Sequence, residues 1–416
     1  MTDPATTDGR ATADVREDAA RGPRVTRRAA LALGGGIAGA AVAHGVGPAL
    51  AGHVPREPTP NRPPPSSDLF SHEETLLAFR NHGFHAEMTD RPITPLGSHY
   101  LLIHFDIPEL SAAGHRLTVG GRVARRLNLT LEDLKRRPTV KQPSILECAG
   151  TGRSFAHPRA IYVPWFSEPI GVYEYTGTPL KPLLEEAGLL DDATEVVFTG
   201  ADEGIDLGVR HNFERALPVD DALADGVILA WEANGQPLLP AHGFPLRLVV
   251  PSYYGMASVK WLTTITVIDH TYQGVEQQQV YRLQSSSSDG GRGLRQKSVR
   301  SVLKPPGFPD AISRKRFLST GTHELRGMAW SGRGPITEVE VSTDDRRTFR
   351  RATLERPVSP FAWTPFRFTW NATRRGEQII SSRATDVTGA QQPLEAYWNV
   401  QGMAQNSVER IAVQVV

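Results

Sequence analysis

The chain has one cysteine, Cys148, among its 416 residues. One thiol cannot close an internal disulfide, and it cannot supply a Cys-x-x-Cys zinc or haem site. The fold must therefore be held by a buried apolar core. A composition of 39% apolar and 22% charged residues is typical of a globular protein that can bury such a core. At this length we expect two domains and an additional leader.

The charge of the chain is almost balanced, with 46 basic and 45 acidic side chains and a formal net charge of +1. Neither a polybasic tail nor a long run of one sign occurs, so we expect no nucleic-acid partner. Electrostatic attraction toward a charged ligand must therefore come from a local site.

The first 51 residues have the order of a signal peptide. A polar start leads to Arg27-Arg28, then to an Ala/Gly/Val run, and then to the small-x-small end Ala49-Leu50-Ala51. The arginine pair and the weak hydrophobicity predict the twin-arginine route for residues 1–51, and hence a periplasmic or other extracytoplasmic location. The run is too glycine-rich to predict stable membrane insertion. Residues 52–67 predict an extended Pro-rich linker.

Residues 68–275 mix short strands with helical stretches and lack regular strand–helix alternation, which predicts an α+β domain. Residues 129–136, with Thr130 as the N-cap, predict a short capped helix. Residues 180–187 predict another helix, ended by Gly188. Residues 117–123 alternate around Gly120-Gly121 and predict two strands joined by a turn.

The composition changes after this domain. Residues 276–316 predict a connecting segment, and its Gln/Ser/Gly/Arg-rich stretch 285–300 is typical of a mobile link. In residues 317–416 apolar positions such as Val339, Val341 and Val413 alternate with polar ones. Several such strands separated by turns predict a β-sandwich of about the immunoglobulin size.

Cys148 lies in the glycine-rich segment Glu147-Cys148-Ala149-Gly150-Thr151-Gly152-Arg153. Exposed backbone N–H groups and a nearby arginine lower the pKa of a thiol, which makes it a nucleophile or a metal ligand. The alternative is a small buried apolar residue without chemistry. This segment resembles the molybdenum-binding cysteine motif of the sulfite oxidase family.

Other segments carry the same resemblance, which extends over residues 94–416. The segments Trp231–Leu238, His242–Arg247 and Val259–Leu262 are similar to the pterin-binding run of that family. The segments Trp330–Gly332, Ala384–Asp386 and Trp398-Asn399 are similar to its dimerisation domain. The resemblance therefore implies an α+β molybdopterin-binding domain followed by an immunoglobulin-like dimerisation domain, most similar to bacterial sulfite dehydrogenases and sulfane dehydrogenase subunits.

The resemblance also implies a molybdenum cofactor with one pterin and oxygen-atom transfer at sulfur. Cys148 would be the metal ligand, and Arg153 and Tyr281 would act on the substrate. Arg and Lys suit the pterin phosphate, and an Asp carboxylate suits the ring N–H groups. The implied pterin-binding residues are His104, Cys148, Asp202, His242, Arg247, Ser258, Val259 and Lys260.

Two positions depart from the family pattern for a sulfite site. Leu102 and Gln401 stand where arginines are expected. Each lost charge-assisted hydrogen bond costs about 1.5–3 kcal/mol, so losing two would weaken sulfite binding by about two to four powers of ten. Arg80 and Arg159 are candidates to replace them.

The expected partners are a small sulfur compound, an external electron acceptor such as a c-type cytochrome, and a second copy of the chain. We expect no haem in this chain, because a Cys-x-x-Cys-His motif is absent. Three alternatives remain at this point. They are a reductase of a sulfoxide or another oxide on the same cofactor, an exported binding protein without activity, and a thiol hydrolase using Cys148 and a histidine.

Overall fold

The computed structural model describes residues 72–286, 288–395 and 397–416. The leader and most of the linker predicted from the sequence lie outside these residues. Within the described ranges, no helix is long and apolar enough to span a membrane.

The first sheet of the α+β part joins segments that are far apart in the sequence. Its strands follow the order β2 (Leu127–Thr130), β1 (Arg116–Gly121), β10 (Leu262–Ile268), β5 (Glu195–Asp206) and β6 (Val209–Pro218). β1 pairs in parallel with β10 and antiparallel with β2, so both of its edges are occupied. Leu117, Phe198 and Ile265 bury their side chains in the core of this sheet.

The strand pair predicted around Gly120-Gly121 is wrong, because residues up to Gly121 form the single strand β1. Gly121 has φ 85°, and a Cβ there would lie 2.1 Å from the carbonyl oxygen of Val267. The glycine therefore allows close approach to β10 rather than a hairpin turn. Val123 makes only an isolated bridge to Leu189.

A second sheet carries the cysteine segment. Its strands are β3 (Val140–Glu147), β4 (Ile170–Pro179), β7 (Ile228–Ala233), β8 (Gln236–Pro237) and β9 (Arg247–Val249), where β9 pairs with β7. The α-helices of this part are α2 (His72–Arg80), α3 (Leu131–Lys135), α4 (Leu180–Ala187) and α5 (Val219–Ala222). Short 3-10 helices are η1 (Ala86–Met88), η2 (Arg153–Phe155), η3 (Pro240–His242) and η4 (Gly255–Ala257), and η5 (Glu276–Val280) is a short π-helix.

Both predicted helices are present. The Thr130 hydroxyl accepts a hydrogen bond from the backbone N–H of Asp133, and the Asp133 carboxylate accepts one from the N–H of Thr130, which completes a capping box at α3. Gly188 ends α4 in the left-handed conformation with φ 70°.

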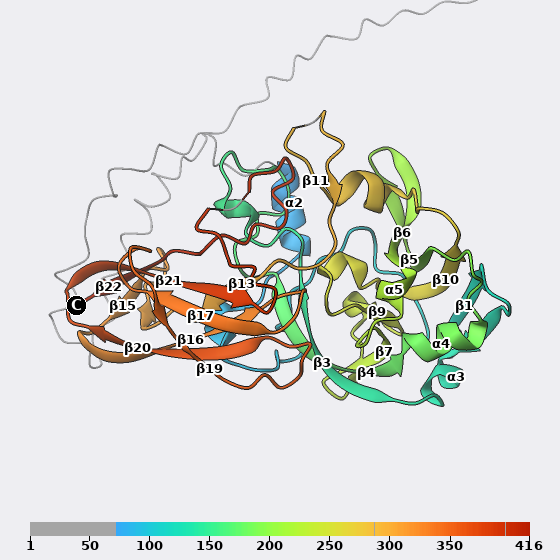
Figure 1. The fold of residues 1–416 in the computed structure, drawn as a ribbon. Coiled ribbons are helices and arrows are strands. Elements are labelled where there is room, and N and C mark those ends of the chain that lie inside the picture. Colours follow the sequence, from blue (N-terminus) through green and yellow to red (C-terminus); the bar gives the residue numbers. More distant parts are fainter. Residues whose placement is uncertain (1–71, 287, 396) are drawn as a thin grey trace, which may run out of the picture. The chain divides into compact units, whose positions relative to one another are not determined.

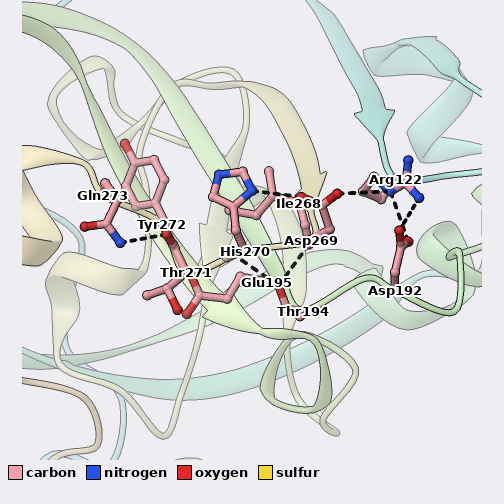
Figure 2. Close-up of polar contacts among 10 residues, drawn as sticks. All are labelled: Arg122, Asp192, Thr194, Glu195, Ile268, Asp269, His270, Thr271, Tyr272 and Gln273. Carbon is pink, nitrogen blue, oxygen red and sulfur yellow. Dashed lines mark hydrogen bonds and ion pairs between the residues drawn. The ribbon is translucent and has the colours of Figure 1, made fainter.

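Polar contacts fix the chain between β10 and η5 (Figure 2). The backbone N–H of Thr194 donates to Ile268 at 2.8 Å, and that of Tyr272 donates to the Glu195 carboxylate at 2.7 Å. Arg122 lies 3.7 Å from Asp269. Because this segment leads into η5 and then to Tyr281, these contacts fix the direction from which Tyr281 enters the interior.

The C-terminal part is an immunoglobulin-like sandwich of two sheets (Figure 1). One sheet has the order β13 (Arg300–Leu303), β16 (Gly321–Trp330), β20 (Thr364–Ala372) and β19 (Thr353–Leu354). The other has the order β14 (Phe308–Pro309), β15 (Arg316–Leu318), β22 (Ile411–Val415), β21 (Gly376–Asp386), β17 (Ile336–Ser342) and β18 (Arg350–Arg351). Leu325 and Phe366 from the first sheet share one core with Val339 and Ile380 from the second.

This sandwich begins earlier than residue 317, because β13 and β14 belong to its sheets. The stretch 285–300 was expected to be a mobile link. Instead it contains strand β12 (Arg292–Gly293), which pairs with β11 (Arg282–Leu283) just before it, and Leu294 and Lys297 are buried.

A buried polar cluster links the end of β3 to the sandwich. Trp330 donates its indole N–H to Glu147 at 2.7 Å. Lys297, which is 0% exposed, donates to the carbonyls of Ile145, Pro251 and Tyr253. The residue that precedes Cys148 is therefore held by both parts of the molecule.

Candidate active site

The loop after β3 presents Cys148 with its backbone fully bonded. The N–H of Cys148 donates to Pro169 at 2.8 Å, and its carbonyl accepts from the Thr151 hydroxyl at 2.7 Å. Gly152 has φ 82°, and a Cβ there would lie 2.7 Å from the carbonyl oxygen of Gln405. The glycine-rich sequence is therefore required by the turn that leads from the thiol to Arg153.

Two hollows adjoin the thiol. The inner cavity is lined by His99, Tyr100, Leu101, Leu102, His104, Leu146, Cys148, Ala149, Asp202, Phe213, Ala241, His242, Arg247, Gly255, Met256, Ser258, Lys260 and Tyr281, and it holds about 610 Å³ including its open mouth. The outer pocket holds about 760 Å³ including its open mouth and is lined by Leu102, Cys148, Gly150, Arg153, Ala160, Ile161, Tyr162, Trp165, Val280, Tyr281, Val400, Gln401 and Met403. Leu102, Cys148 and Tyr281 line both.

The structure brings most of the predicted site residues to these two hollows. The predicted pterin-binding side chains at the inner cavity are His104, Cys148, Asp202, His242, Arg247, Ser258 and Lys260. Val259 packs its side chain in the core instead, and its carbonyl accepts from the Leu248 N–H at 2.8 Å. Arg153 and Tyr281 line the outer pocket with Cys148.

Two buried cations stand at the inner cavity. The Arg247 guanidinium donates to the carbonyls of His242 at 3.0 Å and Ser258 at 3.1 Å. The Lys260 ammonium donates to the carbonyls of Leu102 at 2.9 Å and Ala241 at 3.1 Å. Both side chains donate to backbone carbonyls rather than to a carboxylate, so they can also receive an anionic group.

Burial shifts the titration of the polar groups around this cavity. Burial raises the pKa of Asp202 to about 7, although the Lys260 ammonium opposes that shift. Burial lowers the pKa of Lys260 to about 7, and Arg247 adds to that shift. Asp202 Oδ1 is buried and has no hydrogen-bond partner among the described residues, so it is available to accept from a ligand N–H.

The histidines of the cavity are neutral at pH 7. Burial lowers the pKa of His104 to about 3 and that of His242 to about 2. His104 Nε2 and the Tyr281 hydroxyl share a hydrogen bond of 2.6 Å. Since burial also raises the pKa of Tyr281 well above its ordinary value, this pair holds a proton without carrying a charge.

Arg153 is held rigidly beside the thiol. Its Nε donates to the Gln401 carbonyl at 2.9 Å and its Nη1 to the Val163 carbonyl at 2.8 Å. The guanidinium lies 5.0 Å from the centre of the Tyr162 ring. Burial raises the pKa of Cys148, whereas the Arg153 charge and the Gly150 N–H lower it. Because burial has the largest effect, the protonated thiol is favoured over the thiolate at this position.

The two positions that depart from the family pattern both lie at the site. Leu102 and Gln401 line the outer pocket with Arg153. Arg159 pairs with Glu74 and Arg80 donates to the Phe105 carbonyl, and neither lines the pocket. The structure therefore does not bring either of these two candidates to the outer pocket.

Three site residues were not predicted from the sequence. His99 lines the inner cavity with a buried Nε2 that has no partner among the described residues, and Trp165 lines the outer pocket. Arg215 lies 5.2 Å from the Tyr281 ring centre and donates to the Glu276 carbonyl at 2.5 Å. The aromatic run Tyr162-Val163-Pro164-Trp165-Phe166 was a usable signal, whereas no local pattern marks Arg215.

Within the described ranges, no group of three or more His, Cys, Asp or Glu side chains is arranged to hold a metal ion. Cys148 is the sole thiol of the chain. It is buried and lies where the inner cavity meets the outer pocket.

Comparison with known protein families identifies both parts of the chain. Residues 104–276 match the oxidoreductase molybdopterin binding domain. Residues 294–416 match the Mo-co oxidoreductase dimerisation domain. The matched ranges contain Cys148 and the other predicted site residues, apart from Tyr281, which lies between the two.

Individual relatives agree with these matches. The NADH nitrate reductase of Solanum lycopersicum is 28% identical over 83% of this chain and 40% of its own length. The mitochondrial sulfite oxidases of Drosophila melanogaster and Mus musculus are both 30% identical, over 78% and 79% of this chain. The chain spans 59% and 63% of those two relatives.

A solved structure extends the likeness to the whole described fold. The sulfane dehydrogenase SoxCD from Paracoccus pantotrophus superposes with a TM-score of 0.66 at 25% identity, covering 89% of this chain and 97% of that one. The fold and the two matched domains agree, and the chain belongs to the sulfite oxidase family of molybdopterin-dependent oxidoreductases.

Proposed function

We propose that the chain oxidises sulfite or a related sulfur compound by oxygen-atom transfer, and that its electrons pass to an external acceptor such as a c-type cytochrome. The observation that carries this proposal is the position of Cys148. It lies between an inner cavity that contains Arg247 and Lys260 and an outer pocket that contains Arg153. The sulfur-acting relatives support the same reaction type.

The residues of the inner cavity fit a molybdenum–pterin cofactor. The unpartnered Oδ1 of Asp202 and Nε2 of His99 are buried and suit the N–H and oxygen groups of a pterin. Arg247 and Lys260 supply the charge that a terminal phosphate requires. Cys148 would hold the metal, because a soft thiolate is a suitable ligand for such a centre.

When bound, the cofactor supplies the two-electron redox chemistry and the transferable oxygen. Arg153 attracts the substrate anion and stabilises charge that develops at the sulfur oxygens. Its two bonds to backbone carbonyls fix the guanidinium before the substrate arrives, so little reorganisation is needed. The neutral His104–Tyr281 pair holds a proton at the boundary of both hollows.

We further propose export by the twin-arginine route and assembly as a homodimer. The order of residues 1–51 supports export, since that route carries folded proteins with cofactors in place. The match of residues 294–416 to a dimerisation domain supports the dimer. The contact with an electron carrier would be small and transient.

The test is reduction of ferricyanide by enzyme matured in its own host and containing about one molybdenum per chain. The proposal predicts that sulfite or another reduced sulfur compound drives the reaction. Reduction of a sulfoxide or of nitrate by the same preparation, without oxidation of any sulfur compound, would contradict it and favour a reductase.

A further inference from the structure

The outer pocket has a single cationic side chain among the residues that line it, Arg153. Its Nε and Nη1 are bonded to carbonyls, and Nη2 has no hydrogen-bond partner within the described ranges. Leu102 and Gln401, the two neighbours that the family pattern would make arginines, are uncharged. One guanidinium balances one negative charge, so a second charge on the ligand would be buried without a partner.

Tyr162 forms part of the wall of the same pocket, and its ring centre lies 5.0 Å from the Arg153 guanidinium. This aromatic contact adds no second positive charge that could balance a dianion.

The walls of the pocket are largely apolar. The apolar side chains that line it are Leu102, Ala160, Ile161, Trp165, Val280, Val400 and Met403. A pocket of this composition suits a ligand that carries hydrocarbon.

Neutral polar groups complete the site. Gln401 Oε1 is buried and has no hydrogen-bond partner in the part of the chain that the structure describes. Unpaired buried groups of this kind are rare unless a ligand or water satisfies them. The Gln401 amide therefore adds polarity to the site without adding charge, while the Trp165 side chain contacts the Cys148 thiol.

Resting on the proposed function, we propose that the substrate is an organic sulfinate: one negative charge faces Arg153, and an alkyl or aryl substituent packs on the apolar wall. The sulfinate sulfur uses its lone pair to form one new S–O bond. The balanced reaction is R–SO₂⁻ + H₂O → R–SO₃⁻ + 2 H⁺ + 2 e⁻. A one-electron acceptor, present in two equivalents, takes the electrons.

The experiment compares benzenesulfinate, methanesulfinate and sulfite as substrates of the molybdenum-loaded enzyme, with ferricyanide as acceptor. We expect kcat/KM to be about tenfold or more higher for benzenesulfinate than for sulfite, which corresponds to one decade of binding. In the variant Leu102→Arg/Gln401→Arg we expect the preference to change by about 100-fold toward sulfite. The matched control Leu190→Arg/Gln273→Arg adds the same charge at two exposed positions and should keep the wild-type preference.

A binding measurement that needs no turnover accompanies the kinetics. In isothermal titration of the wild-type enzyme, benzenesulfonate should bind about tenfold or more tightly than sulfate. Equal or tighter binding of sulfate, or a higher kcat/KM for sulfite, would overturn the sulfinate pocket and leave oxidation at sulfur intact. Oxidation of neither sulfite nor sulfinate by loaded enzyme would instead overturn the proposed function itself.

Discussion

At the scale of single residues, Tyr281 connects the two hollows. Its hydroxyl is 2.6 Å from His104 Nε2, and its ring lies against the Arg215 guanidinium. Tyr281→Phe removes the hydroxyl and keeps the ring, so we expect kcat/KM with the sulfur substrate to fall about tenfold while the cofactor stays bound. Tyr397→Phe, at a side chain that is 65% exposed, is the control and should have no effect. Unchanged kinetics in Tyr281→Phe would remove this tyrosine from the reaction.

The buried histidines predict how stability depends on pH. Burial lowers the pKa of His99 to about 4 and that of His104 to about 3. Below pH 6.5 the unfolded chain therefore binds protons that the folded chain does not, and stability falls as the pH falls from 7 toward 4. Each such imidazole contributes up to about 1.4 kcal/mol per pH unit in that window.

The loss of Tm between pH 7 and pH 5 should therefore be smaller in His99→Gln than in the wild type, as measured by calorimetry. His270→Gln, at an exposed histidine, is the control and should lose as much as the wild type. An identical pH dependence in all three proteins would contradict a neutral buried His99.

At the scale of elements, the capping box of α3 gives a local prediction. Thr130→Ala removes the hydroxyl that accepts from the Asp133 N–H, which should lower stability by about 1 kcal/mol. Thermal unfolding should then shift down by about 2–4 °C. Thr139→Ala, at an exposed threonine outside the helices and with only a 3.3 Å contact, should leave Tm nearly unchanged. Equal Tm values for both variants would show that the cap contributes nothing.

Whether a helix or strand could be predicted from the sequence depends on how local its contacts are. The cap at Thr130 and the glycine end of α4 depend on neighbouring residues, and both were predicted. Gly121 was assigned to a turn because its real reason, contact with β10, involves a strand more than 140 residues away. Strand β6 was not predicted, because its sequence VRHNFERALP is largely polar. Its strand conformation depends on the antiparallel pairing with β5.

The residues of the candidate site also include some that were predicted from the sequence and some that were not. The motif around Cys148 and the series His242, Arg247 and Lys260 were predicted from the family resemblance, and the structure gathers them at one cavity. Arg215 reaches the site through the folded arrangement of distant segments, and no local pattern marks it. The missing arginines at Leu102 and Gln401 were predicted from the family resemblance, and the structure places both residues at the outer pocket.

At the scale of the whole molecule, the buried cluster between β3 and the sandwich should couple the two parts. Lys297→Met leaves the carbonyls of Ile145, Pro251 and Tyr253 without this donor. It also removes one of the two cations that act on Glu147, so that only Arg300 remains. We expect a loss of about 3 kcal/mol or more in stability. Lys315→Met, at a lysine side chain that is 43% exposed, should cost less than about 0.5 kcal/mol. Equal stability of the two variants would contradict the coupling.

The proposed reaction depends most on Cys148 as the protein ligand of the molybdenum. X-ray absorption at the molybdenum edge of the loaded enzyme tests this directly, by counting sulfur neighbours in the wild type and in Cys148→Ser. We predict one sulfur neighbour fewer in the variant, together with loss of turnover and a fold that still melts cooperatively. The same number of sulfur neighbours in both proteins, or full turnover in the variant, would contradict the central claim.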